Sequence, residues 1–181
     1  MIRVLLTILA GMLLGGVVHF VSVLALPRIA TQDAYARISP ISKVNVVTPL
    51  PPVAPGEEPM PFMDPAFALA VCRYDLGAGP LKLRVPVSQA YTSVSFYSRN
   101  DVAYYAINDR SAGRRVIELD LMTREQRSEL PDDEEVTAAD RLIVESPTTT
   151  GLILVRALSP ERGLMQMARQ ALIAAKCTVA Q

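Results

Sequence analysis

The sequence has few of the side chains on which common catalytic sites depend. Histidine occurs once, as His19, and it lies within a long apolar stretch. A Ser/His/Asp triad, a Cys/His dyad and histidine-bound zinc are therefore excluded from the rest of the chain. The two cysteines cannot form a structural zinc site alone. There is also no phosphate loop, dinucleotide fingerprint or serine nucleophile elbow, and we expect no metal and no cofactor.

An excess of positive charge is also missing. The 18 Lys and Arg residues are balanced by 18 Asp and Glu residues, and they form no basic block. Tryptophan is absent, which removes one common platform for stacking bases. We therefore expect no nucleic-acid partner.

Charge is absent from the N-terminal region. Residues 4–26 carry no formally charged side chain when His19 is neutral. About 20 apolar residues span a bilayer, whereas the apolar core of a cleaved signal peptide has roughly 7–15. We predict a transmembrane signal anchor in residues 1–26 that contacts the bilayer through residues 4–26.

Cleavage of this segment is the alternative. A small-x-small site occurs at residues 34–36, but Arg28 and Asp33 would then lie between the apolar core and the cut. An uncleaved anchor is favoured for this reason.

The orientation of the anchor rests on two opposing arguments. Arg3 is the only charged side chain before the span, and three basic residues come after it: Arg28, Arg37 and Lys43. Positive charges alone would place the C-terminal part in the cytoplasm. Long domains, however, translocate largely regardless of charge, and we predict that the N-terminus is inside and the C-terminal domain outside.

One stripe of the predicted span carries small and polar residues. Thr7, Gly11, Gly15 and His19 recur every four residues and so share one helix face. Gly11 and Gly15 form a GxxxG motif, which permits close packing of two helices. We name these four residues as a helix-packing face. Because glycine is common in such helices, a chance occurrence is the alternative.

Residues 27–64 form a predicted connecting segment. Pro27 is expected to end the span. Seven prolines between residues 49 and 65 favour an extended, semi-rigid spacer over a ligand for a proline-binding domain. Apolar Met60, Phe62 and Met63 suggest that its second half lies against the next domain.

Residues 65–181 are predicted to form one β-rich domain. Short apolar runs alternate with turn signals, which is typical of antiparallel structure. Seven strands are expected: 67–76, 81–85, 91–98, 102–107, 116–122, 141–145 and 152–158. The break at 77–80 would close a hairpin between the first two. Thr123 and Gln126 have the spacing of a capping box, which predicts a short helix from Arg124.

The end of the chain predicts a final helix. Ser159, Pro160 and Glu161 suit a helix start, and apolar residues then line one face as far as about Lys176. The predicted fold class is therefore α+β. An N-terminal transmembrane helix precedes a mainly antiparallel, sandwich-like β domain on which a C-terminal helix packs.

Cys72 and Cys177 lie at opposite ends of the predicted domain. Cys72 has no histidine base nearby, so a catalytic thiol is disfavoured. If the domain lies outside, oxidising conditions favour a disulfide between the two cysteines over two buried thiols.

Two groups of polar residues remain as site candidates. Asn108, Arg110, Arg114 and Arg115 surround one connection and could hold a carboxylate or phosphate. The alternative is that these residues simply build a turn. Asp75, Glu118 and Asp120 could meet across a sheet and support acid–base hydrolysis. The acidic run 132–135 is interpreted as a solvated segment.

A family resemblance adds to these observations. Residues 74–113 carry Asp75-Leu76, Gly79-Pro80, the alternating run 81–85, Pro86 and Tyr91. In these residues the chain resembles the short, membrane-anchored members of the bacterial family named domain of unknown function 1254. The resemblance implies a cell-envelope protein with a β-rich domain, and it implies no activity or catalytic residue. The stretch "DPAFALAVCR" departs from the longer members.

Together these observations predict a single-pass protein of the bacterial inner membrane with a cytoplasmic N-terminus and a periplasmic domain. We expect the domain to bind a protein partner in the membrane or envelope, or a small ligand, without catalysis. Two alternatives are a carboxylate-dependent, hydrolase-like envelope enzyme and a membrane-complex subunit that assembles through its transmembrane helix.

Overall fold

The computed structural model describes residues 1–29, 33–52, 60, 63–113, 115–130 and 142–180. The chain divides into two units, Met1–Asp33 and Ala34–Gln181. The acidic run 132–135 and Arg114 lie outside the described residues.

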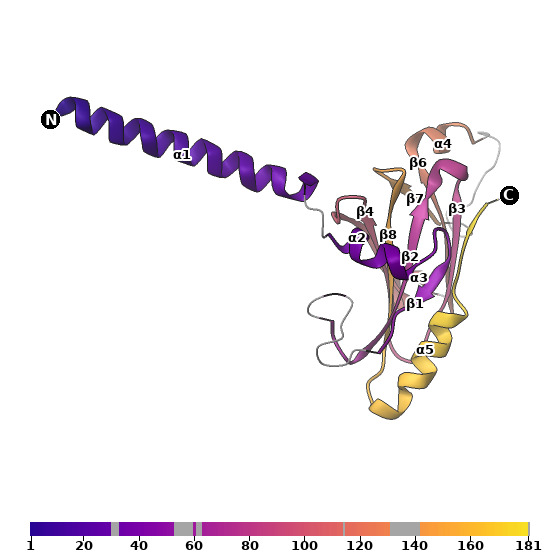
Figure 1. Ribbon diagram of the computed structural model, residues 1–181. Coiled ribbons are helices and arrows are strands. Elements are labelled where there is room, and N and C mark those ends of the chain that lie inside the picture. The colour runs from indigo at the N-terminus through magenta and orange to yellow at the C-terminus, as the bar shows by residue number, and fades with distance from the viewer. Residues whose placement is uncertain (30–32, 53–59, 61–62, 114, 131–141, 181) are drawn as a thin grey trace. The chain divides into compact units, whose positions relative to one another are not determined.

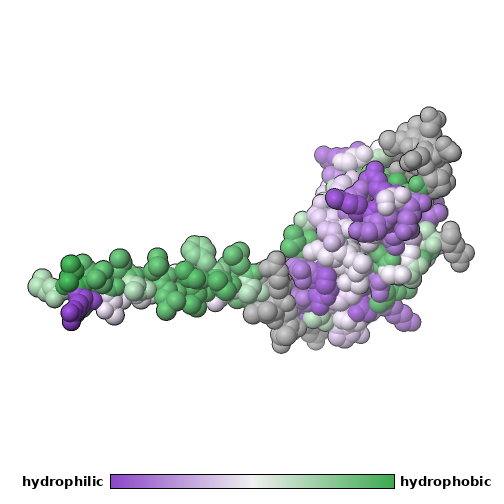
Figure 2. All heavy atoms as spheres, turned by 90° about the horizontal axis from the view of Figure 1, so that it is seen from above, coloured by the Kyte–Doolittle hydropathy of each residue, from purple (hydrophilic) through white to green (hydrophobic). Residues whose placement is uncertain are grey.

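The first unit is built around one long helix, α1 (Ile2–Ile29). Residues Ile2–Leu26 are long and apolar enough to cross a membrane. Figure 2 shows hydrophobic side chains along this helix. The candidate membrane span ends at Leu26, immediately before Pro27, although the helix itself continues to Ile29. Because Pro27 has no amide hydrogen, the helix lacks the hydrogen bond to the Val23 carbonyl, and it ends two residues later.

The second unit contains two sheets (Figure 1). Sheet A has the strand order β1-β2-β8-β4-β5, and sheet B has the order β7-β6-β3-β9. The strands of sheet A are β1 (Val47–Pro49), β2 (Phe67–Asp75), β8 (Thr150–Leu158), β4 (Thr92–Ser98) and β5 (Ala103–Asn108). Those of sheet B are β7 (Leu142–Ser146), β6 (Val116–Thr123), β3 (Leu81–Pro86) and β9 (Lys176–Val179). The pairing is antiparallel except between β6 and β7, which are parallel.

Both sheets contribute to one buried core. Alternate residues of β2, β4 and β8 face those of β3 and β6, as in Phe96, Ile153 and Leu83, none of which is more than 1% exposed. The burial of β3 alternates strictly, as its sequence predicts. The α+β class, the two mostly antiparallel sheets and the C-terminal helix are confirmed.

The predicted hairpin at residues 77–80 is wrong. β2 pairs with β1 and β8 in sheet A, whereas β3 pairs with β6 and β9 in sheet B. A short 3-10 turn, η2 (Leu76–Ala78), and Gly79 with φ of 128° carry the chain from one sheet to the other. Only glycine adopts that backbone conformation without strain.

Segments around the sheets extend the fold. The short helices are α2 (Ala34–Ile38), η1 (Ser39–Ile41), α3 (Asp109–Ala112), α4 (Arg124–Ser128) and η3 (Arg162–Leu164). Ile38 and Leu50 pack on Val71 and Leu152 on the outer face of sheet A. This part of the predicted connecting segment thus belongs to the second unit, because it removes an apolar sheet face from water. Met60 and Met63 also pack there.

The last helix is shorter than predicted. α5 (Met165–Ile173) packs against β2 and β8 through the buried Ala168 and Leu172. Ser159 is not its N-cap, because its hydroxyl donates to the Glu161 carbonyl and α5 starts six residues later. The predicted capping box at α4 is present, with Thr123 and Gln126 bonded reciprocally.

A disulfide joins Cys72 of β2 to Cys177 of β9, across 105 positions of sequence. It links β2, an inner strand of sheet A, to β9 at the edge of sheet B. Cys177 lies on β9, a strand that the sequence analysis did not predict. The bond therefore joins the two sheets.

Candidate functional site

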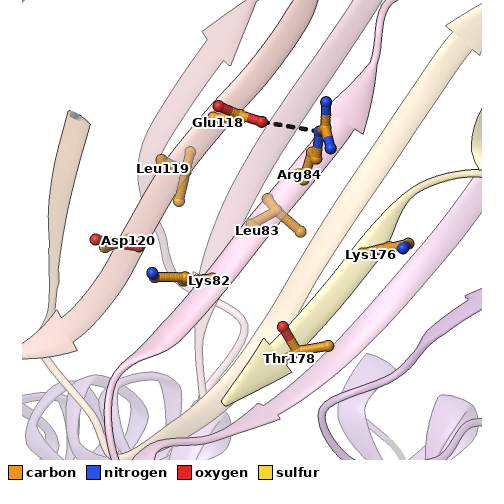
Figure 3. A pocket seen from close by; sticks show the side chains of 8 residues that line it. All are labelled: Lys82, Leu83, Arg84, Glu118, Leu119, Asp120, Lys176 and Thr178. Carbon is orange, nitrogen blue, oxygen red and sulfur yellow. Dashed lines mark ion pairs between the residues drawn. The ribbon is translucent and has the colours of Figure 1, made fainter. Parts of the chain in front are cut away.

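The outer face of sheet B carries two rows of opposed polar side chains. In one row Arg84 of β3 lies between Glu118 of β6 and Lys176 of β9. In the other row Lys82 lies between Asp120 and Thr178. We call these six residues the charged face (Figure 3). Acids occupy β6, and bases and a hydroxyl occupy β3 and β9.

The two rows form because residues of one strand alternate between the faces of a sheet. Leu81, Leu83 and Val85 are buried in the core, and this turns Lys82 and Arg84 outward. Cys177 is held inward by its disulfide, which turns Lys176 and Thr178 outward.

Only some of these charged side chains form ion pairs. The Arg84 Nε atom lies 2.8 Å from Glu118 Oε1. Within the described residues, neither Lys82 nor Lys176 forms an ion pair. Lys176 stands directly opposite Arg84, and like charges in that position repel. An external anion would relieve this repulsion.

The charged face is hollowed. A depression of about 430 Å³ lies over β6, β3 and β9 and includes all six residues (Figure 3). Asp120 is 3% exposed, whereas Glu118 and the three bases Lys82, Arg84 and Lys176 are exposed. The accessible groups of the depression are therefore mostly donors with positive charge.

The three acids proposed for hydrolysis do not meet. Asp75 is at the end of β2 in sheet A, where its Oδ1 accepts from the Gly77 amide at 2.8 Å. Glu118 and Asp120 lie on sheet B, and Glu118 is paired with Arg84. Among the described residues, Asp120 is the only buried acid. A pair of buried carboxylates in one cleft is what the enzyme alternative requires, and these three residues do not provide it.

Metal binding has no support in the described ranges. They contain no group of three or more His, Cys, Asp or Glu side chains that could hold an ion.

The predicted anion loop is arranged around a short helix. Asn108 caps α3, and its Oδ1 accepts from the Ser111 amide at 2.9 Å. Gly113 closes α3 in the left-handed region, at φ of 61°. Arg110 and Arg115 are exposed, and Arg114 lies outside the described residues. Asn108 and Gly113 have the roles of turn builders, and anion binding here stays a prediction.

The predicted helix-packing face lies on α1. Thr7, Gly11, Gly15 and His19 are all exposed, and the Thr7 hydroxyl donates to the Arg3 carbonyl at 2.7 Å. A Cβ atom added to Gly11 or to Gly15 would have no neighbouring atom within 4 Å. The stripe is thus open along its length, and its pairing with another helix stays a prediction.

Sequence reasoning missed two of the six residues of the charged face. The alternation of residues 81–85 predicts that Lys82 and Arg84 lie on a wet surface. Lys176 and Thr178 fall instead at the predicted end of the last helix and just beyond it, so their place on a strand is not foreseen. The alternation of "KCTV", with Cys177 buried between two polar residues, is the signal that could have identified the strand.

Solved structures share this fold. A crystal structure of a Vibrio parahaemolyticus protein matches with a TM-score of 0.59 and 12% identity, over 80% of this chain and 32% of that one. An uncharacterized protein from Burkholderia cenocepacia matches with a TM-score of 0.50 and 15% identity, over 84% of this chain and 39% of that one. The chain thus spans about a third of the length of the solved structures that it matches.

The comparison with curated proteins gives no match. A family model, described as a protein of unknown function (DUF1254), matches residues 44–178. This range begins before β1 and ends within β9, so it takes in both sheets and the disulfide. The chain therefore belongs to the DUF1254 family.

Proposed function

We propose that this protein is a membrane-anchored envelope protein whose β domain binds an acidic partner protein through the charged face, without catalysis. The observation that carries the proposal is the pair of lysines, Lys82 and Lys176, which have no ion-pair partner within the described residues and flank one depression. An open sheet face with unmatched charge suits a protein surface of opposite sign.

The location is part of the same proposal. Helix α1 would span the bacterial inner membrane once, with the N-terminus in the cytoplasm and the β domain in the periplasm. The apolar helix supports an anchor, and the disulfide supports an oxidising compartment. An uncleaved anchor would keep the β domain tethered to the membrane.

The lysines permit a direct test. Two of the three lysines of the chain lie on the charged face, and the third, Lys43, is exposed elsewhere in the second unit. Cells are treated with an amine-reactive crosslinker that does not cross the inner membrane. We expect an adduct with one protein in the wild type. The double variant Lys82→Arg/Lys176→Arg, which keeps the charge but not the reactive amine, should lose most of it.

Lys43→Arg is the matched control and should retain the adduct. A second double variant, Lys82→Glu/Lys176→Glu, should lower the affinity for the captured protein at least tenfold, because close charge pairs contribute on the order of 1.5 kcal/mol or more. An adduct that survives in Lys82→Arg/Lys176→Arg, or no adduct at all, would contradict the proposal.

A further inference from the structure

A second depression, which we call the end pocket, lies away from the charged face. It has a volume of about 470 Å³, and side chains from β5, β6, β7 and the β7–β8 turn line it. The residues that matter for its chemistry are Tyr104, Thr123, Glu145, Ser146, Thr148 and Thr149. This volume is in the range of small-molecule sites, but five of these six residues carry hydroxyl groups.

A β-bulge brings Tyr104 to this pocket. β5 pairs with β4 in regular register as far as Tyr105 opposite Phe96, and the register then shifts so that Ala103 lies opposite Tyr97. The extra residue is Tyr104. A bulge re-aims a side chain, and both Tyr104 and Tyr105 contact the Phe96 ring as a result. The Tyr104 hydroxyl thereby reaches the buried end of the sandwich.

A chain of hydroxyl groups begins at Tyr104. Its Oη lies 3.2 Å from Tyr74 Oη, and Tyr74 Oη lies 2.9 Å from Ser146 Oγ. Ser146 Oγ is 2.6 Å from the Thr148 carbonyl oxygen. Tyr74 is completely buried and Ser146 is 6% exposed, so the inner part of the chain is shielded from water.

The Thr148 carbonyl at one end fixes the direction of the first hydrogen bond and limits the directions of the others. Ser146 must donate to the Thr148 carbonyl, because a carbonyl oxygen only accepts. Tyr74 Oη therefore donates to Ser146 or to the Tyr97 carbonyl, and Tyr104 donates to Tyr74. The Tyr104 hydroxyl hydrogen is then already used in a hydrogen bond, so toward the pocket the Tyr104 oxygen can act only as an acceptor.

Other lining groups show the same pattern. The Thr148 hydroxyl donates to the Thr150 carbonyl at 2.8 Å, and the Thr123 hydroxyl, which accepts from the Gln126 amide at 3.2 Å, donates to the Glu125 carboxylate. Burial raises the pKa of the Tyr104 phenol well above its ordinary value, and the adjacent Tyr74 raises it further. Tyr104 thus remains a neutral phenol, and the acceptors of the pocket do not change with physiological pH.

The rim of the pocket carries charges of both signs, from Arg124, Glu125 and Glu145. Glu145 forms an ion pair with Arg127, and Arg124 Nε lies 3.9 Å from Glu145 Oε2. An ammonium ligand would meet Arg124, and an anion would meet Glu125, Glu145 and the lone pairs of the hydroxyl groups. A neutral molecule with many hydroxyl groups supplies the missing donors without either conflict.

We infer that the end pocket is a binding site for a neutral polyhydroxylated molecule, a saccharide, with Tyr104 Oη as its principal buried acceptor. The site is distinct from the charged face. It does not depend on the proposed partner, and either proposal can fail alone.

The test uses full-length protein in lipid nanodiscs, because many detergents carry sugar headgroups. Maltose and N,N′-diacetylchitobiose are titrated by calorimetry. We expect at least one disaccharide to bind with a Kd of about 1 mM or tighter. Tyr104→Phe, which keeps the ring, should weaken that binding about five- to tenfold through the loss of one hydrogen bond. Thr149→Val, at the exposed part of the lining, should weaken it about twofold or more.

Tyr105→Phe is the matched control, because Tyr105 also packs on Phe96 but does not line the pocket. It should leave the affinity unchanged. The inference is overturned if neither disaccharide binds at about 10 mM. It is also overturned if Tyr104→Phe and Thr149→Val both bind as the wild type does, or if spermidine binds more tightly than both sugars.

Discussion

Replacing both cysteines, in Cys72→Ala/Cys177→Ala, is expected to lower the free energy of unfolding of the β domain by about 3–4 kcal/mol. The bond closes a loop with a sequence separation of 105, and in the chain-entropy model a loop of this length gains close to 5 kcal/mol. Measured values usually fall below that limit. Because β9 is a four-residue edge strand, its pairing with β3 should suffer most.

Urea unfolding of the full-length protein provides the measurement. All six tyrosines lie in the second unit, so near-ultraviolet circular dichroism monitors that unit without a signal from tyrosine in α1. The wild type unfolded with a reductant present should show a decrease similar to that of the double variant. A decrease below about 1 kcal/mol in both would show that the disulfide contributes little to the fold.

Gly151→Ala is expected to destabilise the β domain by about 3 kcal/mol, at the upper end of ordinary overpacking. A Cβ atom at this position would lie 2.3 Å from the Tyr97 carbonyl oxygen and 2.4 Å from Tyr74 Oη. The carbonyl belongs to the neighbouring strand β4, so it cannot move without disturbing the pairing of β4 with β8. Tyr74 would also lose its place in the hydroxyl chain.

Gly163→Ala is the matched control for this prediction. No atom lies within 4 Å of a Cβ built on Gly163, and its change should stay within about 0.5 kcal/mol. Both variants are compared by urea unfolding under the same conditions. If Gly151→Ala were as stable as Gly163→Ala, Gly151 could not lie as close to the Tyr97 carbonyl oxygen as described here.

The sequence correctly predicted the elements that depend on interactions between residues close together along the chain. The uncharged run at 4–26 predicted a long apolar helix, because a charge there would be costly in a bilayer. The spacing of Thr123 and Gln126 predicted α4 because both capping bonds are made within four residues. Strict alternation at residues 81–85 predicted which side chains of β3 are buried.

Nonlocal pairing was not predictable in the same way. The turn at residues 77–80 is compatible with a hairpin and with a crossing between sheets, and only the partners of β2 and β3 decide between them. β1 and β9 have three and four residues, too few for an alternation signal to stand out. Two of the six residues of the charged face lie on β9, and the hydroxyl chain of the end pocket joins residues up to 72 positions apart. Neither site could be assembled before the fold was known.

The central claim is that the β domain is held in an oxidising compartment by an N-terminal anchor. It is tested most directly by the state of the two cysteines in growing cells. Cells are quenched with acid, which stops thiol exchange, and the protein is then unfolded and alkylated with a maleimide mass tag. The account predicts a membrane-bound protein that gains no tag before reduction and two tags after it. A protein that gains two tags before reduction would contradict the account.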